Sequence, residues 1–181
     1  MTNKQLFTSL FVLILIESIL AGHAVTATRT LHENIVACVE HRAKSILVSQ
    51  LTSSQFRTAE LLAEDIKQHL RYDYDIKQSR VWQHNLYSSI INKTSSYILY
   101  MTDGAGICTD FTRVYTTMLK AALIDAYQLD RVKLKNGSEH SYVIATLDGT
   151  TYRIDITSYC TAAAHDADTS FSTYVKEVHL Q

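Results

Sequence analysis

Three residue types that form nucleophilic triads occur along the chain in the order cysteine, histidine, aspartate: Cys108, His140 and Asp155. A thiolate attacks a carbonyl carbon, an imidazole takes or holds the thiol proton, and a carboxylate fixes the imidazole and stabilises its charged form. Together they would perform covalent acyl transfer through a thioester. The three residues therefore form a candidate catalytic set, provided that the fold brings them together.

The segment Asp103–Arg113 places Cys108 where a glycine-rich turn becomes a helix. Gly104 and Gly106 allow a tight turn. Apolar residues then recur at helical spacing: Ile107, Phe111, Val114, Tyr115, Met118 and Ala122. In the first turn of a helix, unpaired backbone N–H groups and the macrodipole favour the thiolate. A cysteine taken alone is more often a small buried hydrophobic residue. The catalytic hypothesis for Cys108 therefore depends on His140 and Asp155.

His140 opens an apolar run, 140–147, and Asp155 lies in a second run, 151–157; both runs are typical of strands. Asp148-Gly149 between them is a strong hairpin signal. Two adjacent strands would hold imidazole and carboxylate side by side. The alternative is that His140 lies at the surface at a strand end and that Asp155, flanked by two isoleucines, faces solvent.

These residues resemble the transglutaminase-like superfamily of cysteine enzymes, relatives in fold and chemistry of the papain-like proteases. Gly106–Thr112 is similar to its Gly-x-Cys-x-(Asp/Glu)-(Phe/Tyr)-Ala nucleophile motif, His140–Tyr142 to its His-Ala-Trp strand, and Asp155–Thr157 to its Asp-Pro-Thr. Segment 70–74 resembles a family helix ending in Tyr-Asp. The resemblance implies an α+β fold, with helices packed on a small antiparallel sheet and the nucleophile at a helix N-terminus.

Other patterns predict the elements around these motifs. The sequence predicts helices over 31–50, 58–70 and 81–91, a short extended piece over 97–100, an edge strand over 131–135, and a last helix or strand over 171–178. Tyr100 is expected to line the cleft. The Cys108 backbone N–H is expected to hold an oxyanion, and Gln83 and Tyr100 are the weak candidates for a second donor.

The N-terminal residues resemble a secretory signal peptide. Lys4 supplies positive charge, 6–20 is apolar, and small residues follow, so cleavage is expected after Ala24 or Ala27. The alternative is an uncleaved anchor, although the apolar run is shorter than the roughly 20 residues of a spanning helix. We therefore expect a signal peptide over 1–24, a single domain over 25–181, and a secreted or periplasmic protein.

Composition narrows the partners and the number of domains. The 181 residues contain 17 Lys and Arg against 18 Asp and Glu, a net charge of −1, without a basic cluster that would favour nucleic acid. Proline is absent, and no linker or repeat indicates a second domain. No histidine pair has the His-Glu-x-x-His spacing, so neither metal nor cofactor is expected. The expected partner is a protein or peptide substrate, and the oligomeric state stays open.

The three cysteines leave two possibilities for the other thiols. In an oxidising compartment Cys38 and Cys160 could pair and leave Cys108 free, or all three could be free. Cys38 is expected on the core face of its helix. The predicted function is amide attack by a secreted cysteine enzyme, whether a peptidase, a glutamine deamidase or a cross-linking transglutaminase. The alternative is a non-catalytic secreted binding domain, or a membrane-anchored surface protein, of the same fold.

Overall fold

The structure is a computed structural model that describes the backbone of residues 3–50, 54–74, 86–162 and 170–178, and the side chains of 21–49, 54–74, 93–162 and 170–178. The helices are α1 (Asn3–Gln50), α2 (Gln55–His69), α3 (Leu86–Met101), α4 (Cys108–Ala121), α5 (Ile156–Thr161) and the 3-10 helix η2 (Phe171–Tyr174). The strands are β1 (Arg71–Tyr72), β2 (Ala105–Gly106), β3 (Ala126–Lys133), β4 (Glu139–Leu147), β5 (Thr150–Ile154) and β6 (Val175–Glu177).

The main sheet is antiparallel, with strand order β3-β4-β5-β6, and β1 and β2 form a separate parallel pair. The hairpin between β4 and β5 turns at Asp148 and Gly149, whose φ angles are 50° and 86°. Two consecutive positive φ angles match the twist of adjacent strands, which explains the Asp-Gly sequence. The predicted α+β class, with helices packed on a small antiparallel sheet, is confirmed.

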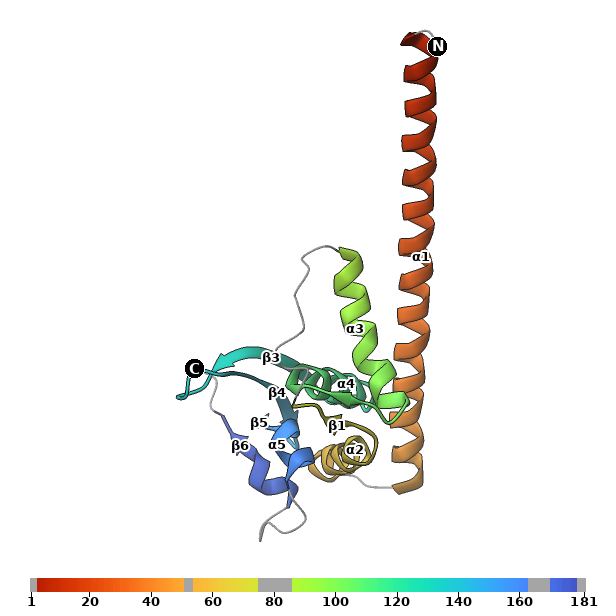
Figure 1. Ribbon diagram of the computed structural model, residues 1–181. Coiled ribbons are helices and arrows are strands. Elements are labelled where there is room, and N and C mark those ends of the chain that lie inside the picture. Colours follow the sequence, from red (N-terminus) through yellow and green to blue (C-terminus); the bar gives the residue numbers. More distant parts are fainter. Residues whose placement is uncertain (1–2, 51–53, 75–85, 163–169, 179–181) are drawn as a thin grey trace.

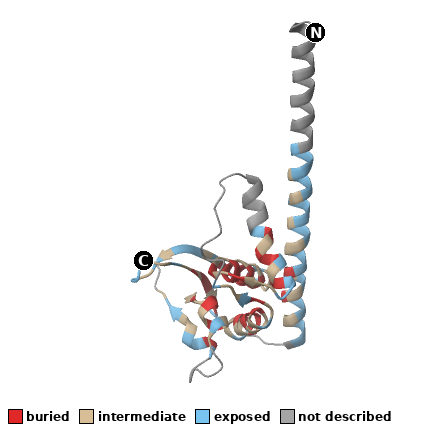
Figure 2. Ribbon diagram, viewed as in Figure 1, coloured by how far each residue is buried: buried red, intermediate tan, exposed pale blue. Residues whose placement is uncertain are grey.

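Helix α4 lies at the centre of the domain (Figure 1). It packs against β3 and β4 on the sheet and also contacts α1, α2, α3 and α5. The side chains of its core face are fully buried: Phe111, Val114, Tyr115, Met118 and Leu119. Burial of such side chains contributes roughly 1.5–3 kcal/mol each. Figure 2 shows buried residues concentrated along α4 and the elements that touch it, so the helix that begins at Cys108 is held on all sides.

Helix α1 is longer than the segment predicted from periodicity, because it begins at Asn3 rather than near residue 31. Val39 and Ala43 are buried near its C-terminal end, whereas residues 21–31 are mostly exposed. The N-terminal part of α1 extends past the rest of the domain (Figure 1). The expected signal-peptide boundary lies inside this continuous helix. In the segments that the structure describes, no helix has both the length and the apolar character needed to cross a membrane.

One local prediction is wrong, and another lies partly outside the described residues. Residues 97–100, expected to be extended, belong to α3, where Tyr97 and Tyr100 are both buried. A short apolar run fits a strand or a buried helix equally well, and the i, i+3 spacing of the two tyrosines decides for the helix. Residues 81–85 of the predicted third helix lie outside the described segments. Segment 70–74 does more than end a helix, because Arg71 and Tyr72 pair with the turn before Cys108.

The remaining predicted elements agree with the structure, with shifts at their ends. Segment 171–178, expected to be a helix or a strand, contains both, as η2 followed by β6. Asp155, expected inside a strand, instead follows β5 and caps the N-terminus of α5, where its side chain accepts a hydrogen bond from the Ser158 N–H. Asp is favoured at such caps, which explains why the strand ends at Ile154.

All three cysteines are free thiols, so Cys38 and Cys160 do not form the disulfide considered from the sequence. Cys38 is exposed, which corrects its expected place on the core face, because its neighbour Val39 takes the fully buried position on α1. Cys160 is partly covered, with its sulfur 4.0 Å from the Ala63 carbonyl oxygen. Burial raises the pKa of the Cys160 thiol well above its ordinary value, so this thiol stays protonated.

Candidate active site

Cys108 is the first residue of α4 and is 8% exposed. The turn before it is held by backbone hydrogen bonds that Arg71 and Asp73 donate to the carbonyl groups of Gly104 and Gly106, at 3.0 and 2.8 Å. Helix geometry leaves the first N–H groups of α4 without acceptors inside the helix. The sulfur therefore lies at the positive end of a rigid helix, where a thiolate is favoured.

The glycine of the nucleophile motif is required by the aspartate that follows it. The Asp110 side chain folds back and accepts a hydrogen bond from the Ile107 N–H at 2.8 Å, so it caps the start of α4. Ser96 donates to the same carboxylate at 2.6 Å. A Cβ atom at Gly106 would lie only 2.8 Å from the Asp110 carboxylate. Gly106 and Asp110 thus fix the helix start together, and with it the place of Cys108.

His140 and Asp155 meet although they are not on directly paired strand positions. His140 lies near the start of β4, and Asp155 follows the last residue of β5. The pairing of Val143 with Ile154 brings them to the same end of the hairpin. His140 Nε2 lies 2.9 Å from Asp155 Oδ1, and the two side chains are 16% and 23% exposed. The alternative of two surface residues facing solvent is thereby excluded.

His140 also lies beside the Cys108 thiol, and the two side chains line one pocket, so the structure brings all three predicted site residues together. Because Nε2 is used by Asp155, the sulfur is left for the other ring nitrogen, Nδ1. This order, sulfur to imidazole to carboxylate, is the geometry of a cysteine triad. Their catalytic role remains a prediction.

Charge effects in the group favour a thiolate beside an imidazolium. Burial opposes ionisation of all three side chains, but the hydrogen bonds and charges between them outweigh it. The hydrogen bonds from His140 and Ser141 lower the pKa of the Cys108 thiol. Those with Asp155 and Cys108 raise the pKa of His140 to about 9. His140 and the Ser158 N–H lower the pKa of Asp155. These interactions therefore favour a charged His140 imidazolium beside the sulfur near neutral pH.

Ser141 is a further member of the site that its place in the sequence did not reveal. It is 2% exposed, and its backbone N–H and its hydroxyl both lie near enough to the Cys108 thiol to lower its pKa. The hydroxyl also lies 2.8 Å from Asp130 Oδ1 and 3.3 Å from the Thr109 hydroxyl. Asp130 belongs to a β-bulge between Leu129 and Val132. Bulges re-aim side chains beside active sites, but a period-two sequence pattern does not locate them.

A pocket of about 140 Å³ opens over the sulfur. Its lining contains Cys108 and His140, together with Arg131 and Glu139 from the facing ends of β3 and β4. Arg131 has a φ angle of 57°, as part of the bulge. Tyr100, expected in this cleft, is 1% exposed and donates its hydroxyl hydrogen bond to Asp65 instead, so it is no oxyanion donor. Gln83, the other candidate, lies outside the described residues.

Among the described residues no group of three His, Cys, Asp or Glu side chains has the arrangement of a metal site. The side chains at Cys108 offer a polarised thiol beside an imidazole that can hold or release its proton.

Comparisons with known proteins give a family match and a remote structural likeness. A solved structure from Cytophaga hutchinsonii, described as a proposed cysteine protease, resembles the chain with a TM-score of 0.45 and 17% identity, over 67% of this chain and 37% of that one. This likeness is too remote to carry an argument, and the chain spans well under half of that protein. No curated protein matches. The family model of a transglutaminase-like domain matches residues 41–177, which is most of the chain. The chain therefore belongs to the transglutaminase-like domain family.

Proposed function

We propose that the protein is an exported cysteine enzyme whose Cys108 thiolate attacks an amide carbonyl and forms a thioester. The observation that carries the proposal is His140, hydrogen bonded to Asp155 on one side and facing the Cys108 thiol on the other. Membership of the transglutaminase-like family supports a cysteine enzyme in general. Export is proposed from the N-terminal sequence, with its positive residue, apolar run and small residues.

In the first half of the reaction the sulfur forms a bond to the carbonyl carbon, and the carbonyl oxygen becomes an oxyanion. We expect the Cys108 N–H, at the start of α4, to donate to that oxygen, a type of interaction generally worth several kcal/mol. The His140 imidazolium then gives its proton to the leaving nitrogen as the carbon–nitrogen bond breaks. Asp155 holds the ring in the required orientation and stabilises its charged form. The products are the thioester and a free amine or ammonia.

In the second half an oxygen or nitrogen nucleophile attacks the thioester. His140, now neutral, takes a proton from water or an amine, the new bond forms at the carbonyl carbon, and the thiolate leaves. Water gives peptide hydrolysis when the first leaving group was a peptide amine, and glutamine deamidation when it was ammonia. A lysine amine gives a protein cross-link. The pocket of about 140 Å³ has room for a side chain such as that of glutamine rather than for a large ligand.

The test is mass spectrometry of the exported protein after incubation with a glutamine-containing protein and a labelled primary amine. Chain cleavage, deamidation and amine incorporation give different masses, so one experiment separates the three reactions. The matched control is Cys108→Ser, which keeps a small polar side chain at the start of α4. Any of the three products, absent from the control, supports the proposal. A folded protein that yields none of them and no adduct on Cys108 would favour the non-catalytic binding domain.

A further inference from the structure

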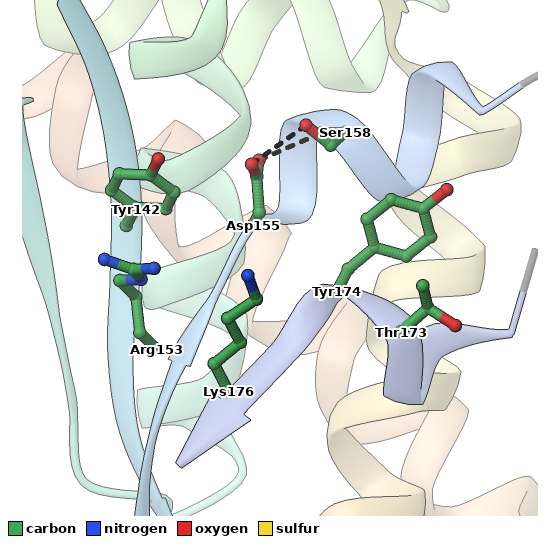
Figure 3. A pocket seen from close by; sticks show the side chains of 7 residues that line it. All are labelled: Tyr142, Arg153, Asp155, Ser158, Thr173, Tyr174 and Lys176. Carbon is green, nitrogen blue, oxygen red and sulfur yellow. Dashed lines mark hydrogen bonds between the residues drawn. The ribbon is translucent and has the colours of Figure 1, made fainter. Parts of the chain in front are cut away.

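A second pocket, of about 220 Å³, lies beside Asp155 on the side of the domain formed by β5, β6, α5 and η2 (Figure 3). It shares no lining residue with the pocket over Cys108. Two of its lining residues are the cations Arg153 and Lys176, and Asp155 is its one carboxylate. The proposed reaction uses neither cation, so this pocket needs an explanation of its own.

The strand register places the two cations against each other. Arg153 on β5 and Lys176 on β6 are direct partners in the antiparallel pair, and Figure 3 shows both side chains directed into the pocket. Like charges at directly opposite positions destabilise a sheet. Within the described segments neither cation forms an ion pair that would offset this repulsion. The arrangement costs stability unless something negative lies between the two side chains.

Asp155 is poorly suited to supply that negative charge. Its Oδ1 accepts hydrogen bonds from His140 Nε2 at 2.9 Å and from the Ser158 N–H at 3.0 Å, and its Oδ2 accepts one from the Ser158 hydroxyl at 2.8 Å. Its charge is thus shared with an imidazole that holds a proton. The pocket is left with an excess of positive charge.

Arg153 is held in a conformation suited to binding an anion. Its guanidinium carbon lies 4.7 Å from the centroid of the Tyr142 ring. Stacking uses the face of the guanidinium and leaves its edge, with the N–H groups, free to donate. That edge matches a carboxylate or phosphate with two parallel hydrogen bonds, while a lysine ammonium adds a point charge. The hydroxyl groups of Tyr142, Thr173 and Tyr174 belong to the same lining and add further polar groups.

We propose that this pocket binds an anionic group, a carboxylate or a phosphate, between Arg153 and Lys176. The group could belong to a small free anion or to an acidic side chain of a bound peptide, because the two share the chemistry that the cations recognise. The inference goes beyond the proposed acyl transfer and does not depend on it. It holds or fails on binding alone, including in a Cys108→Ser variant that has lost its nucleophile.

Binding is measured as a shift in the thermal unfolding midpoint, because a ligand of the folded state raises that midpoint by mass action. Inorganic phosphate, acetate and a short neutral-ended peptide with one glutamate are each compared with sodium chloride at equal ionic strength. We expect a rise in the full-length protein that is lost in Arg153→Met and in Lys176→Met. Lys44→Met is the matched control: it removes an exposed cation of α1 outside the pocket, and the rise should persist.

Two variants of Lys176 should also change the thermal unfolding midpoint when no ligand is added. Lys176→Met should unfold at a slightly higher temperature than the parent protein in sodium chloride, because it removes the like-charge pair; Lys176→Glu, which would attract Arg153, should do so more strongly. A rise with phosphate or acetate indicates a small anion, and a rise with the peptide alone indicates a polypeptide side chain; either supports the site. The proposal is overturned if no anion raises the midpoint, or if both methionine variants respond as the parent does.

Discussion

Among the described residues, two histidines are hydrogen bonded to aspartates, His140 and His69, and His140 is the one that faces a thiol. At the site, His140 Nε2 lies 2.9 Å from Asp155 Oδ1. On the helical side of the domain, His69 Nδ1 lies 2.6 Å from Asp103 Oδ1. The residue types are the same and the distances are similar. The difference lies in what the second nitrogen of each ring contacts.

His69 Nε2 contacts the Arg42 guanidinium. Arginine can only donate, so this ring nitrogen is the acceptor in that contact. Arg42 also binds Asp65 through Nε and Nη2, at 3.0 and 2.9 Å, and the Tyr100 hydroxyl donates to the same carboxylate. Burial and this hydrogen bond raise the pKa of Tyr100, so it remains a donor. The Arg42 cluster joins α1, α2 and α3 as a structural tie.

His140, by contrast, lies between two groups that become more stable when the ring is charged. Asp155 and the Cys108 sulfur both gain from an imidazolium, and the resulting pKa of about 9 keeps the ring protonated at neutral pH. A His-Asp pair is thus no sign of catalysis in itself. The two regions differ in what lies beside the histidine. His140 faces a polarisable thiol at a helix start, with a pocket above it, whereas His69 contacts the Arg42 cation.

Replacing Asp155 at the site or Asp65 in the Arg42 cluster by asparagine should give opposite results. Asp155→Asn should lower the rate, Asp65→Asn should lower the stability, and the larger effect is expected at Asp155. Asp155→Asn removes the charge that supports the imidazolium, so the turnover rate should fall by about 10²–10⁴-fold. Asparagine still caps α5, so the free energy of unfolding should change by less than about 1 kcal/mol. Steady-state rates and chemical denaturation measure the two quantities. An unchanged rate would mean that another group orients His140.

Asp65→Asn should instead lower stability and leave the reaction alone. It leaves Arg42 without its charged partner in a partly buried place, where the side chains of Arg42 and Asp65 are 33% and 14% exposed. The expected loss is about 1–3 kcal/mol in the free energy of unfolding. The turnover rate of the folded fraction should stay within about twofold of the parent's. A large loss of rate without a loss of stability would remove the distinction between the two regions.

Ser141→Ala should have the smallest effect on the site. It removes a hydroxyl that helps to lower the pKa of the Cys108 thiol but leaves the Ser141 backbone N–H, which acts in the same direction. We therefore expect only a small rise in the pKa of the thiol. The acid limb of the pH–rate profile measures this shift. If the acid limb does not move, the Ser141 hydroxyl only donates its hydrogen bond to Asp130 and does not affect the thiol.

The sequence predicted the residues of the site better than the contacts around them. Cys108, His140 and Asp155 were identified from their types, order and motifs, and the Asp-Gly turn indicated the hairpin that brings the last two together. The Arg42 cluster was not predicted, because its members lie on three helices whose relative placement depends on tertiary packing. No local pattern indicated that His69 would contact Arg42 and an aspartate.

The sequence-based predictions failed where a shift of one residue along a helix or strand changes which side chain is buried. Cys38 was placed in the core, but its neighbour Val39 is the buried residue. Ser141 follows His140 on β4, and simple alternation would turn it away from the sulfur; the bulge opposite alters the local twist. Residues 97–100 show the same limit, since a short apolar run carries no period long enough to separate a helix from a strand.

The most direct test of the central claim is the pH dependence of Cys108 alkylation by iodoacetamide, followed by peptide mapping. Mapping separates Cys108 from the exposed Cys38 and the shielded Cys160. The thiolate is the reactive form, and an imidazolium stabilises it at every pH between the lowered pKa of the thiol and the value of about 9 for His140. Rapid labelling should therefore persist below the ordinary thiol pKa of about 8.5.

Above pH 9 the rates of acyl transfer and of Cys108 alkylation should change in different ways. His140 loses its proton there, so acyl transfer, which needs the imidazolium as an acid, should decline, whereas alkylation of the thiolate should not. In His140→Ala the midpoint of the alkylation profile should move up towards that of an ordinary thiol. If the Cys108 profile is the same with and without His140, the sulfur is an ordinary buried thiol and the proposed enzyme mechanism is wrong.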